Sequence, residues 1–176
     1  AGAGVPVSDA GAQVRGRQGP GGGLVLAIEA RFPGTTGRKG VDRQTLGARV
    51  LGKPEDLRAL ERIVHPAVAK ARRVFLRRHA AHPMVVLDIP LLFETHGDRQ
   101  MDLVVVVSAP SFLQRRRVMR RPGMSPRRFH RLSAAQLPDY RKRAQADVVI
   151  STARPKWQTR ADVMRLVACL RRSLRR

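Results

Sequence analysis

The sequence predicts an α/β fold in which a parallel sheet lies between layers of helices. Two short apolar runs rich in valine, at residues 84–89 and 103–108, have the pattern of strands buried on both faces, and a third run at 147–150 is expected to be the last strand. Segments with apolar residues at helical spacing separate these runs. Strands that alternate with helices favour a parallel sheet covered by helices on both faces.

Length and composition indicate one domain over residues 1–176. Hydrophobic residues make up 43% of the chain and aromatic residues 4%, so the core has to be built from valine, leucine, isoleucine and alanine. Cys169 stands alone, which excludes an internal disulfide and a cysteine-based zinc cluster and favours a cytoplasmic location. No apolar run is long enough to cross a bilayer, and we expect no secretory signal.

Arginine dominates the formal net charge of +22: all but five of the 35 basic residues are arginines. Alanine and glycine are abundant too, as a GC-rich coding bias would produce. The alternative is a polyanion partner, because such a surface attracts phosphate backbones. The chain has only one Trp and one Tyr for stacking on bases, so its composition favours non-specific over specific nucleic-acid binding.

Short elements and glycine-rich turns are expected in the first part of the chain. Asp9 has the position of an N-cap for a following helix, and the glycines at 19–23 with Pro20 break that helix. The expected elements are, in order, a strand at Val5–Val7, a helix at Ala10–Arg17, a helix at Leu24–Phe32 and a loop at Pro33–Gly40.

Helices are expected to fill most of the remaining chain between the strands. Asp42 is placed to cap a helix at Arg43–Leu51, Pro54 opens a further turn, and Pro66 begins a long amphipathic helix that ends at about His79. Later helices are expected at Ser111–Arg120, Ser125–Gln136, Pro138–Ala144 and Lys156–Leu170.

The most informative segment is residues 85–94, with the sequence VVLDIPLLFE. Its apolar residues run into Asp88 at the carboxyl end of the expected strand, where open α/β sheets place their ligand chemistry. Pro90 ends the strand and suits the first turn of a helix. This string resembles the signature of the dephospho-CoA kinases, small P-loop enzymes that phosphorylate the ribose of dephospho-CoA with ATP.

Other segments resemble the same family and follow its order along nearly the whole chain. Asp9-Ala10-Gly11 with Arg15 is similar to its Asp-Ala-Asp motif, although Gly11 replaces the second acid. Further matches are Gly19–Gly22, Val41–Arg43 with Leu46-Gly47, Ile63–Pro66, Val104–Ala109, Gln114 with Arg115–Arg117, and Gln136, Pro138, Lys142-Arg143 and Ala146-Asp147. The resemblance implies a three-layer α/β/α P-loop NTPase fold of the nucleoside-monophosphate-kinase kind, with a helical substrate region at 19–83 and a lid at 115–143.

The resemblance also implies a reaction, the transfer of the γ-phosphate of ATP to the 3′-hydroxyl of dephospho-CoA with Mg²⁺, which is the last step of coenzyme A biosynthesis. The phosphate-binding motif G-x-x-x-x-G-K-[ST] is absent from the 176 residues. The glycines at 19–23 cannot replace it, because no Lys-Ser or Lys-Thr follows them. We therefore expect a sheet without its first strand and a chain that is an N-terminally truncated fragment, a mispredicted start or a decayed copy, and inactive alone.

Two acids are candidate catalytic residues. Through the resemblance Asp9 is the general base for the ribose hydroxyl; from its position alone it is a helix N-cap. Asp88 orients Mg²⁺ through water in the functional interpretation and caps the next helix in the structural one. On the acceptor side the resemblance implies substrate contacts from Arg15, His65, Pro66, Leu91 and Gln136, while the position of His65 before Pro66 also suits a helix N-terminus.

The lid segment from Leu113 to Arg143 carries eleven basic residues and one acid, Asp139. Most charge runs are solvated faces. The resemblance nevertheless implies that a guanidinium stabilises the transferring phosphate, and we assign that catalytic role to Arg117 and Arg143. Asp147 and Ser151, near the last strand, are the expected contacts to the adenine end of ATP.

Two other functions are compatible with the sequence. A decayed, non-catalytic kinase would use its arginine surface to bind a polyanion or nucleic acid. A kinase for another small hydroxyl acceptor would share the fold, and only the resemblance at residues 65–66 and 88–94 argues against it.

Overall fold

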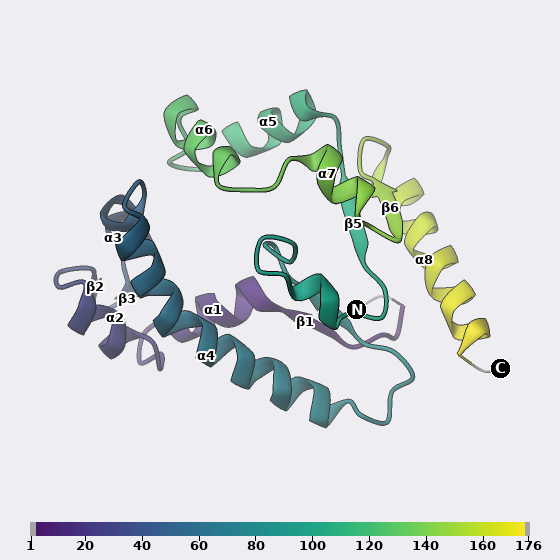
Figure 1. The fold of residues 1–176 in the computed structure, drawn as a ribbon, viewed down its shortest axis with the longest axis horizontal. Helices are drawn as coiled ribbons and strands as arrows, with labels where there is room; N and C mark the ends of the chain where they lie inside the picture. The colour runs from purple at the N-terminus through teal and green to yellow at the C-terminus, as the bar shows by residue number, and fades with distance from the viewer. Residues whose placement is uncertain (1–2, 175–176) are drawn as a thin grey trace. The chain divides into compact units, whose positions relative to one another are not determined.

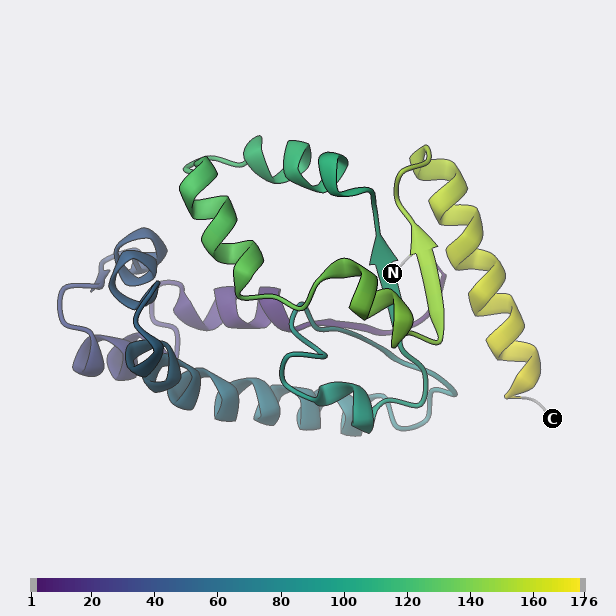
Figure 2. The same cartoon turned by 45° about the horizontal axis from the view of Figure 1, so that its top comes forward.

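The structure is a computed structural model that describes residues 3–174. The chain divides into two compact units, Ala1–Pro90 and Leu91–Arg176, each with its own parallel strand pair. Figure 1 shows the elements of both units, and Figure 2 shows them from a second direction. The expected fold class is confirmed as α/β with parallel strands and helices, although the described strands form three two-stranded sheets rather than one continuous sheet.

The described residues of unit 1, from position 3 on, form one parallel strand pair, a small antiparallel pair and four helices. Its elements are β1 Val7–Asp9, α1 Ala10–Gln18, α2 Val25–Arg31, β2 Thr36–Gly37, β3 Gly40–Val41, α3 Arg43–Val50, α4 Pro54–Arg78 and β4 Val86–Asp88. β1 pairs with β4 in parallel, with Val7 opposite Val86 and Asp9 opposite Asp88. Both N-caps expected from the sequence are confirmed, because Asp9 caps α1 and Asp42 caps α3 with side-chain hydrogen bonds.

The core of unit 1 lies where α2, α3 and the first half of α4 meet. Leu60, Ile63, Val64 and Ala67 of α4 pack against a cluster of buried residues, and their spacing of three and four places them along one side of the helix. The buried members of the cluster are Leu24, Ile28, Phe32, Val41, Leu46, Val50 and Ala59.

One correction concerns α4, which is a single helix of 25 residues. The sequence placed a helix N-terminus at Pro66, but Pro54 occupies the first turn and Pro66 lies inside the helix. The apolar stripe explains the difference, because it continues on both sides of Pro66 without a change of phase. Packing of that stripe outweighs the cost of a proline in a helix interior.

A second correction concerns residues 33–40, where a loop was expected. Thr36–Gly37 and Gly40–Val41 form a small antiparallel pair, β2 and β3. Gly40 has a φ of +85°, and a Cβ there would lie 2.2 Å from the carbonyl oxygen of Gln18. Only glycine lets the backbone pass so close to the end of α1 in this conformation.

Unit 2 contains the second parallel strand pair and the basic helices. Its elements are a 3₁₀ turn η1 Gly97–Gln100, β5 Val105–Ser108, α5 Ser111–Met119, α6 Pro126–Ala134, α7 Asp139–Ala144, β6 Val148–Ser151 and α8 Lys156–Ser173. β5 pairs with β6 from Val105 opposite Val148 to Ser108 opposite Ser151. The helices and strands expected in this half are therefore confirmed, with ends that differ by a few residues.

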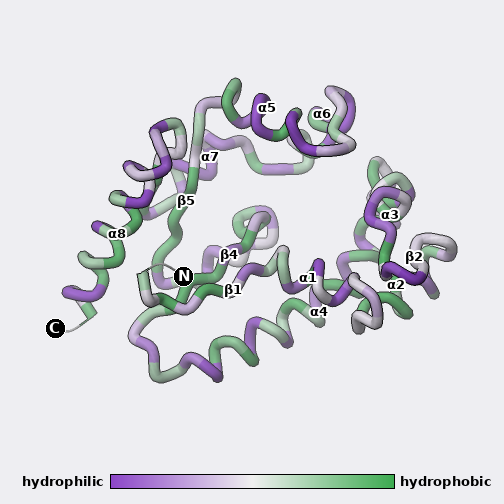
Figure 3. Tube along the Cα trace, turned by 180° about the vertical axis from the view of Figure 1, so that it is seen from behind, coloured by the Kyte–Doolittle hydropathy of each residue, from purple (hydrophilic) through white to green (hydrophobic). Residues whose placement is uncertain are grey.

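The strands are buried on one face rather than two, which corrects the sequence prediction. Along β5, Val106 is buried while Val105 and Val107 are 37% and 63% exposed. Val86 in β4 is also exposed. Figure 3 shows the hydrophobic residues of β4 and β5 along the trace. A run of valines fits both a one-sided and a two-sided strand, so the sequence pattern did not distinguish them. Among residues 3–174, no helix is both long and apolar enough to span a bilayer.

Candidate active site

In unit 1, two carboxylates stand side by side at the carboxyl end of a parallel strand pair. Asp9 is the last residue of β1, Asp88 is the last residue of β4, and the two are opposite each other in the strand register. Adjacent parallel strands lie about 4.8 Å apart, so these acids project from the same edge of the sheet. The sequence named both residues, and the strand pairing is what brings them together.

Each oxygen of Asp9 has a different neighbour. Oδ1 accepts a hydrogen bond of 2.7 Å from the Ala12 N–H, which makes Asp9 the N-cap of α1. Oδ2 faces the Arg15 guanidinium at 3.4 Å, and both side chains are about half exposed. The N-cap interpretation is thus confirmed, and Oδ2 is the oxygen with a single long contact, to Arg15.

Gly11 lies beside this pair. A Cβ at position 11 would lie 3.0 Å from Nη1 of Arg15 and 3.2 Å from Oδ1 of Asp9. A second acid at this place would therefore contact both groups, which is the arrangement that Gly11 removes.

Asp88 is exposed, and its carboxylate does not cap a helix. The residues that follow it form hydrogen-bonded turns, in which Thr95 N–H donates to Leu91 and Gly97 N–H donates to Leu92. The structural interpretation of Asp88 as a cap is therefore wrong. Among residues 3–174, no group of three or more His, Cys, Asp or Glu side chains is placed to hold a metal ion. Asp9 and Asp88 offer two carboxylates, which suits a Mg²⁺ ion that keeps several waters.

His65 and Pro66 lie on α4, where both are exposed. His65 is in the helix interior, so the interpretation of His65 as a helix N-terminal residue is wrong for the same reason as the helix start at Pro66. Its imidazole is accessible from solvent, as a substrate contact requires.

In unit 2, a set of polar contacts joins the carboxyl ends of β5 and β6. Thr152, just after β6, donates from its N–H and its Oγ1 to the carbonyl oxygen of Ser108, at 2.8 and 3.0 Å. Arg117 of α5 donates to the same threonine, with Nη1 3.0 Å from Oγ1 and Nη2 2.6 Å from the carbonyl oxygen. Arg117 is therefore attached to the segment that leaves β6.

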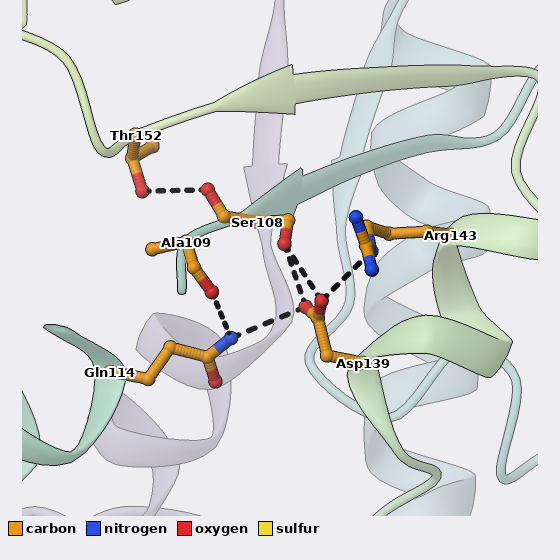
Figure 4. A network of polar contacts seen from close by, with 6 residues as sticks. All are labelled: Ser108, Ala109, Gln114, Asp139, Arg143 and Thr152. Carbon is orange, nitrogen blue, oxygen red and sulfur yellow. Dashed lines mark hydrogen bonds and ion pairs between the residues drawn. The ribbon is translucent and has the colours of Figure 1, made fainter. Parts of the chain in front are cut away.

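Asp139, at the start of α7, is the centre of the other half of these contacts (Figure 4). The buried Ser108 hydroxyl lies 2.9 Å from both of its carboxylate oxygens. Gln114 Nε2 donates to Oδ1 at 3.3 Å, and Arg143 Nε lies 3.0 Å from Oδ2. The sequence analysis assigned no site role to Ser108, Asp139 and Thr152, and named Gln114 only as a family match, although a single acid among eleven basic residues was a signal for Asp139.

Glu94 and Lys142 form the least exposed ion pair of unit 2, with both side chains 17% exposed and Nζ 2.7 Å from Oε1. The same oxygen accepts from the Leu137 N–H at 2.8 Å. Burial raises the pKa of the Glu94 carboxyl, but the hydrogen bonds from Lys142 and from the Leu137 N–H outweigh it, so the pKa lies below its ordinary value. The pair attaches the 91–97 turns to α7, and the Leu137 hydrogen bond attaches them to the residues just before that helix. Leu91 and Gln136, two expected substrate contacts, are both exposed.

The two expected adenine contacts lie at opposite ends of β6. Ser151 is its last residue, at the carboxyl end. Asp147 precedes the strand, and its Oδ2 accepts a hydrogen bond of 2.7 Å from the Val104 N–H. That hydrogen bond gives Asp147 a structural partner at the start of the strand pair.

Comparison with known proteins identifies the family. The family model described as dephospho-CoA kinase matches residues 1–155. A dephospho-CoA kinase of Novosphingobium aromaticivorans is 53% identical over 96% of this chain and 84% of its own length. The chain belongs to the dephospho-CoA kinase family.

Other relatives support this placement. A dephospho-CoA kinase of Zymomonas mobilis is 47% identical over 94% of this chain and 84% of its own length. Among solved structures, a protein of Thermus thermophilus superposes with a TM-score of 0.74 at 32% identity and covers 94% of this chain and 84% of its own. A dephospho-CoA kinase of Campylobacter jejuni has the same fold, with a TM-score of 0.59 at 21% identity over 95% of this chain and 85% of its own.

Proposed function

We propose that this chain takes part in the ATP-dependent phosphorylation of the 3′-hydroxyl of dephospho-CoA, the last step of coenzyme A biosynthesis. The observation that carries the proposal is the pair Asp9 and Asp88, opposite each other at the carboxyl end of β1 and β4, in a chain of the dephospho-CoA kinase family. We place the reaction in the cytoplasm.

Asp9 is the proposed general base. Its Oδ2 accepts the proton of the 3′-hydroxyl while the 3′-oxygen of the substrate bonds to the γ-phosphorus. The bond from the γ-phosphorus to the bridging oxygen breaks at the same time, and ADP leaves. The capping bond from Ala12 to Oδ1 fixes the carboxylate, so that Oδ2 has one orientation. Asp88 is the proposed carboxylate for Mg²⁺, which would neutralise charge on the phosphates when bound.

The other proposed contacts follow from family resemblance and from exposure. Arg15, His65 and Pro66 are the proposed contacts to dephospho-CoA in unit 1, together with Leu91 and Gln136 in unit 2. Each is at least partly accessible to solvent.

On the nucleotide side, Arg117 and Arg143 are the proposed lid arginines for the transferring phosphate. Ser151 is the proposed contact near adenine because it ends β6 at the carboxyl edge. Asp147 is the other proposed contact near adenine, and its Oδ2 also accepts the N–H of Val104.

The 176 residues contain no G-x-x-x-x-G-K-[ST] motif. Because that motif supplies the backbone N–H groups and the lysine that hold the β- and γ-phosphates, we propose that the chain alone does not turn over. The test compares the chain as it is with a version that carries a strand and a P-loop segment from a relative ahead of Ala1. Both are assayed with ATP, Mg²⁺ and dephospho-CoA.

We expect transfer only from the extended protein, and a loss of roughly 10²–10⁴-fold in kcat for its Asp9→Asn variant. An extended protein that binds ATP and dephospho-CoA but transfers no phosphate would refute the proposed reaction. Transfer to other ribose or hydroxyl acceptors at equal rates would refute the substrate. Turnover that is unchanged in Asp9→Asn would refute the role of Asp9 as general base and leave the proposed reaction standing.

The alternative is a non-catalytic protein that binds a polyanion, which the net charge of +22 favours. RNA binding that is saturable, retains sequence preference at moderate salt and occurs without phosphoryl transfer by the extended protein would support it. Binding that falls steeply with salt and ignores sequence would be electrostatic attraction alone.

A further inference from the structure

We propose a division of labour between the two lid arginines. Arg143 presents its two Nη groups to the phosphate, and Arg117 is a positioning residue that acts through Thr152, Ser108 and Asp139. This inference rests on the proposed function for the presence of a phosphate, and on the contacts of unit 2 for the assignment.

The nitrogen atoms that each guanidinium uses differ. Arg143 contacts Asp139 through Nε, which leaves both Nη groups without a hydrogen bond to residues 3–174. Two parallel N–H groups on neighbouring Nη atoms are the geometry that binds phosphate in a bidentate manner. Arg117 already donates one N–H from each of Nη1 and Nη2 to Thr152, so its parallel pair of N–H groups is engaged there.

A series of polar contacts, which passes through Ser108, joins the two arginines. Arg117 contacts Thr152, and Thr152 contacts the Ser108 carbonyl. The Ser108 hydroxyl contacts Asp139, and Asp139 contacts Arg143. Figure 4 shows the part of this series from Thr152 to Arg143, with Ser108 between the two halves.

Ser108 is the rigid point of the series. It ends β5, is only 8% exposed, and uses its carbonyl toward β6 and its hydroxyl toward α7. A buried hydroxyl without a partner is costly, so the contact to Asp139 is favoured over its loss.

Asp139 links Ser108 to Arg143 because it accepts on both oxygens. Oδ1 receives Ser108 and Gln114, and Oδ2 receives Ser108 and Arg143. An asparagine keeps one accepting oxygen and turns an NH₂ group toward a donor. Asp139→Asn therefore removes one of the two accepting oxygens while keeping the size of the side chain.

A matched control exists in α8. Asp162 and Arg165 form another Arg–Asp pair within one helix, and neither belongs to the chain of contacts around Ser108. Asp162→Asn removes the same charge from a similar pair without touching β5, α5 or α7.

The experiment records side-chain Nε–H signals by NMR in the extended protein, which carries the P-loop segment ahead of Ala1, with Arg143 and Arg117 assigned by their loss in Arg143→Lys and Arg117→Lys. The probe is ATP, with inorganic triphosphate as the arm without a base. We expect both probes to shift the Arg143 signal. Arg143→Gln should weaken ATP binding roughly 10- to 100-fold, the effect of losing a charge-assisted hydrogen bond, and Asp139→Asn roughly two- to tenfold, the effect of losing preorganisation.

The ligand-free protein tests the link itself. Asp139→Asn should move the Nε–H signals of both Arg143 and Arg117, while Asp162→Asn moves neither. In a Ser108→Ala background, Asp139→Asn should no longer move the Arg117 signal, because the contact between residue 108 and Asp139 is already lost. Asp139→Glu, which restores a carboxylate, should recover part of the ATP affinity.

Three results would overturn the proposal. If ATP shifts Arg117 and leaves Arg143 unchanged, the assignment of the two arginines is wrong while the proposed function stands. If Asp139→Asn leaves the Arg117 signal in place, the two arginines are not coupled. If neither probe shifts either arginine, the division of labour and the proposed nucleotide site both fail.

Discussion

Replacing Pro66 with alanine tests the continuity of α4. Proline lacks an N–H, so the carbonyl of Arg62, four residues earlier, has no helical donor at position 66. A proline in a helix interior costs about 3 kcal/mol relative to alanine. Arg62 and Pro66 are exposed and water can reach the free carbonyl, so we expect less than this full cost, about 1–2 kcal/mol of added stability.

At about 2–4 °C for each kcal/mol in a protein of this size, Pro66→Ala should raise Tm by about 2–8 °C. Urea unfolding followed by circular dichroism measures the free energy, and scanning calorimetry measures Tm. Lys70→Ala, another exposed substitution in α4, is the control and should change stability by no more than about 0.5 kcal/mol. A Pro66→Ala gain no larger than that of the control, or a loss, would refute a continuous helix through residue 66.

Two other predictions concern stability. Glu94→Gln leaves the half-buried Lys142 without its anion and should cost about 1–3 kcal/mol at pH 7. Because the pKa of Glu94 is lowered in the folded protein, its carboxylate stabilises the fold above about pH 4.3, and this stabilisation is lost as pH falls through the folded pKa. The Glu94→Gln variant should therefore lose less stability than the parent on acidification. An equal loss in pH-dependent melting would contradict this. Gly34→Ala and Gly40→Ala both place alanine at positive φ, which costs about 1–2 kcal/mol, but only position 40 also brings a Cβ within 2.2 Å of the Gln18 carbonyl oxygen. Gly40→Ala should therefore be clearly the more destabilising in urea unfolding, and equal effects would show that the backbones do not approach so closely.

Local signals in the sequence were sufficient for most helices and strands. Asp9 and Asp42 were recognised as caps because a cap and its helix are adjacent in sequence. The helix break at Pro66 was wrong because proline was given more weight than the apolar stripe on either side of it. The β2–β3 pair was missed because it has two residues in each strand, too few for a periodic pattern.

The candidate site was foreseen in part for the same reason. Asp9 was found from its resemblance to a family motif and Asp88 from its place at the end of a strand, but their pairing depends on a contact between residues 79 positions apart. Ser108 forms hydrogen bonds with Asp139, 31 residues away in sequence, and with Thr152, 44 residues away. The sequence around Ser108 does not indicate either bond. Such contacts are set by the parallel arrangement of strands, which the pattern of single elements does not specify.

The valine run of β5 has a consequence for strand alignment. Residues 104–107 are all valine, so sliding β5 by one residue against β6 would replace each valine with another and change little apolar contact. Polar bonds at the two ends distinguish the alignments: Asp147 holds the N–H of Val104 at one end, and Thr152 holds the carbonyl of Ser108 at the other. A slipped strand would lose both hydrogen bonds. Asp147 and Thr152 therefore set the register of β5 against β6, which the valines alone do not specify.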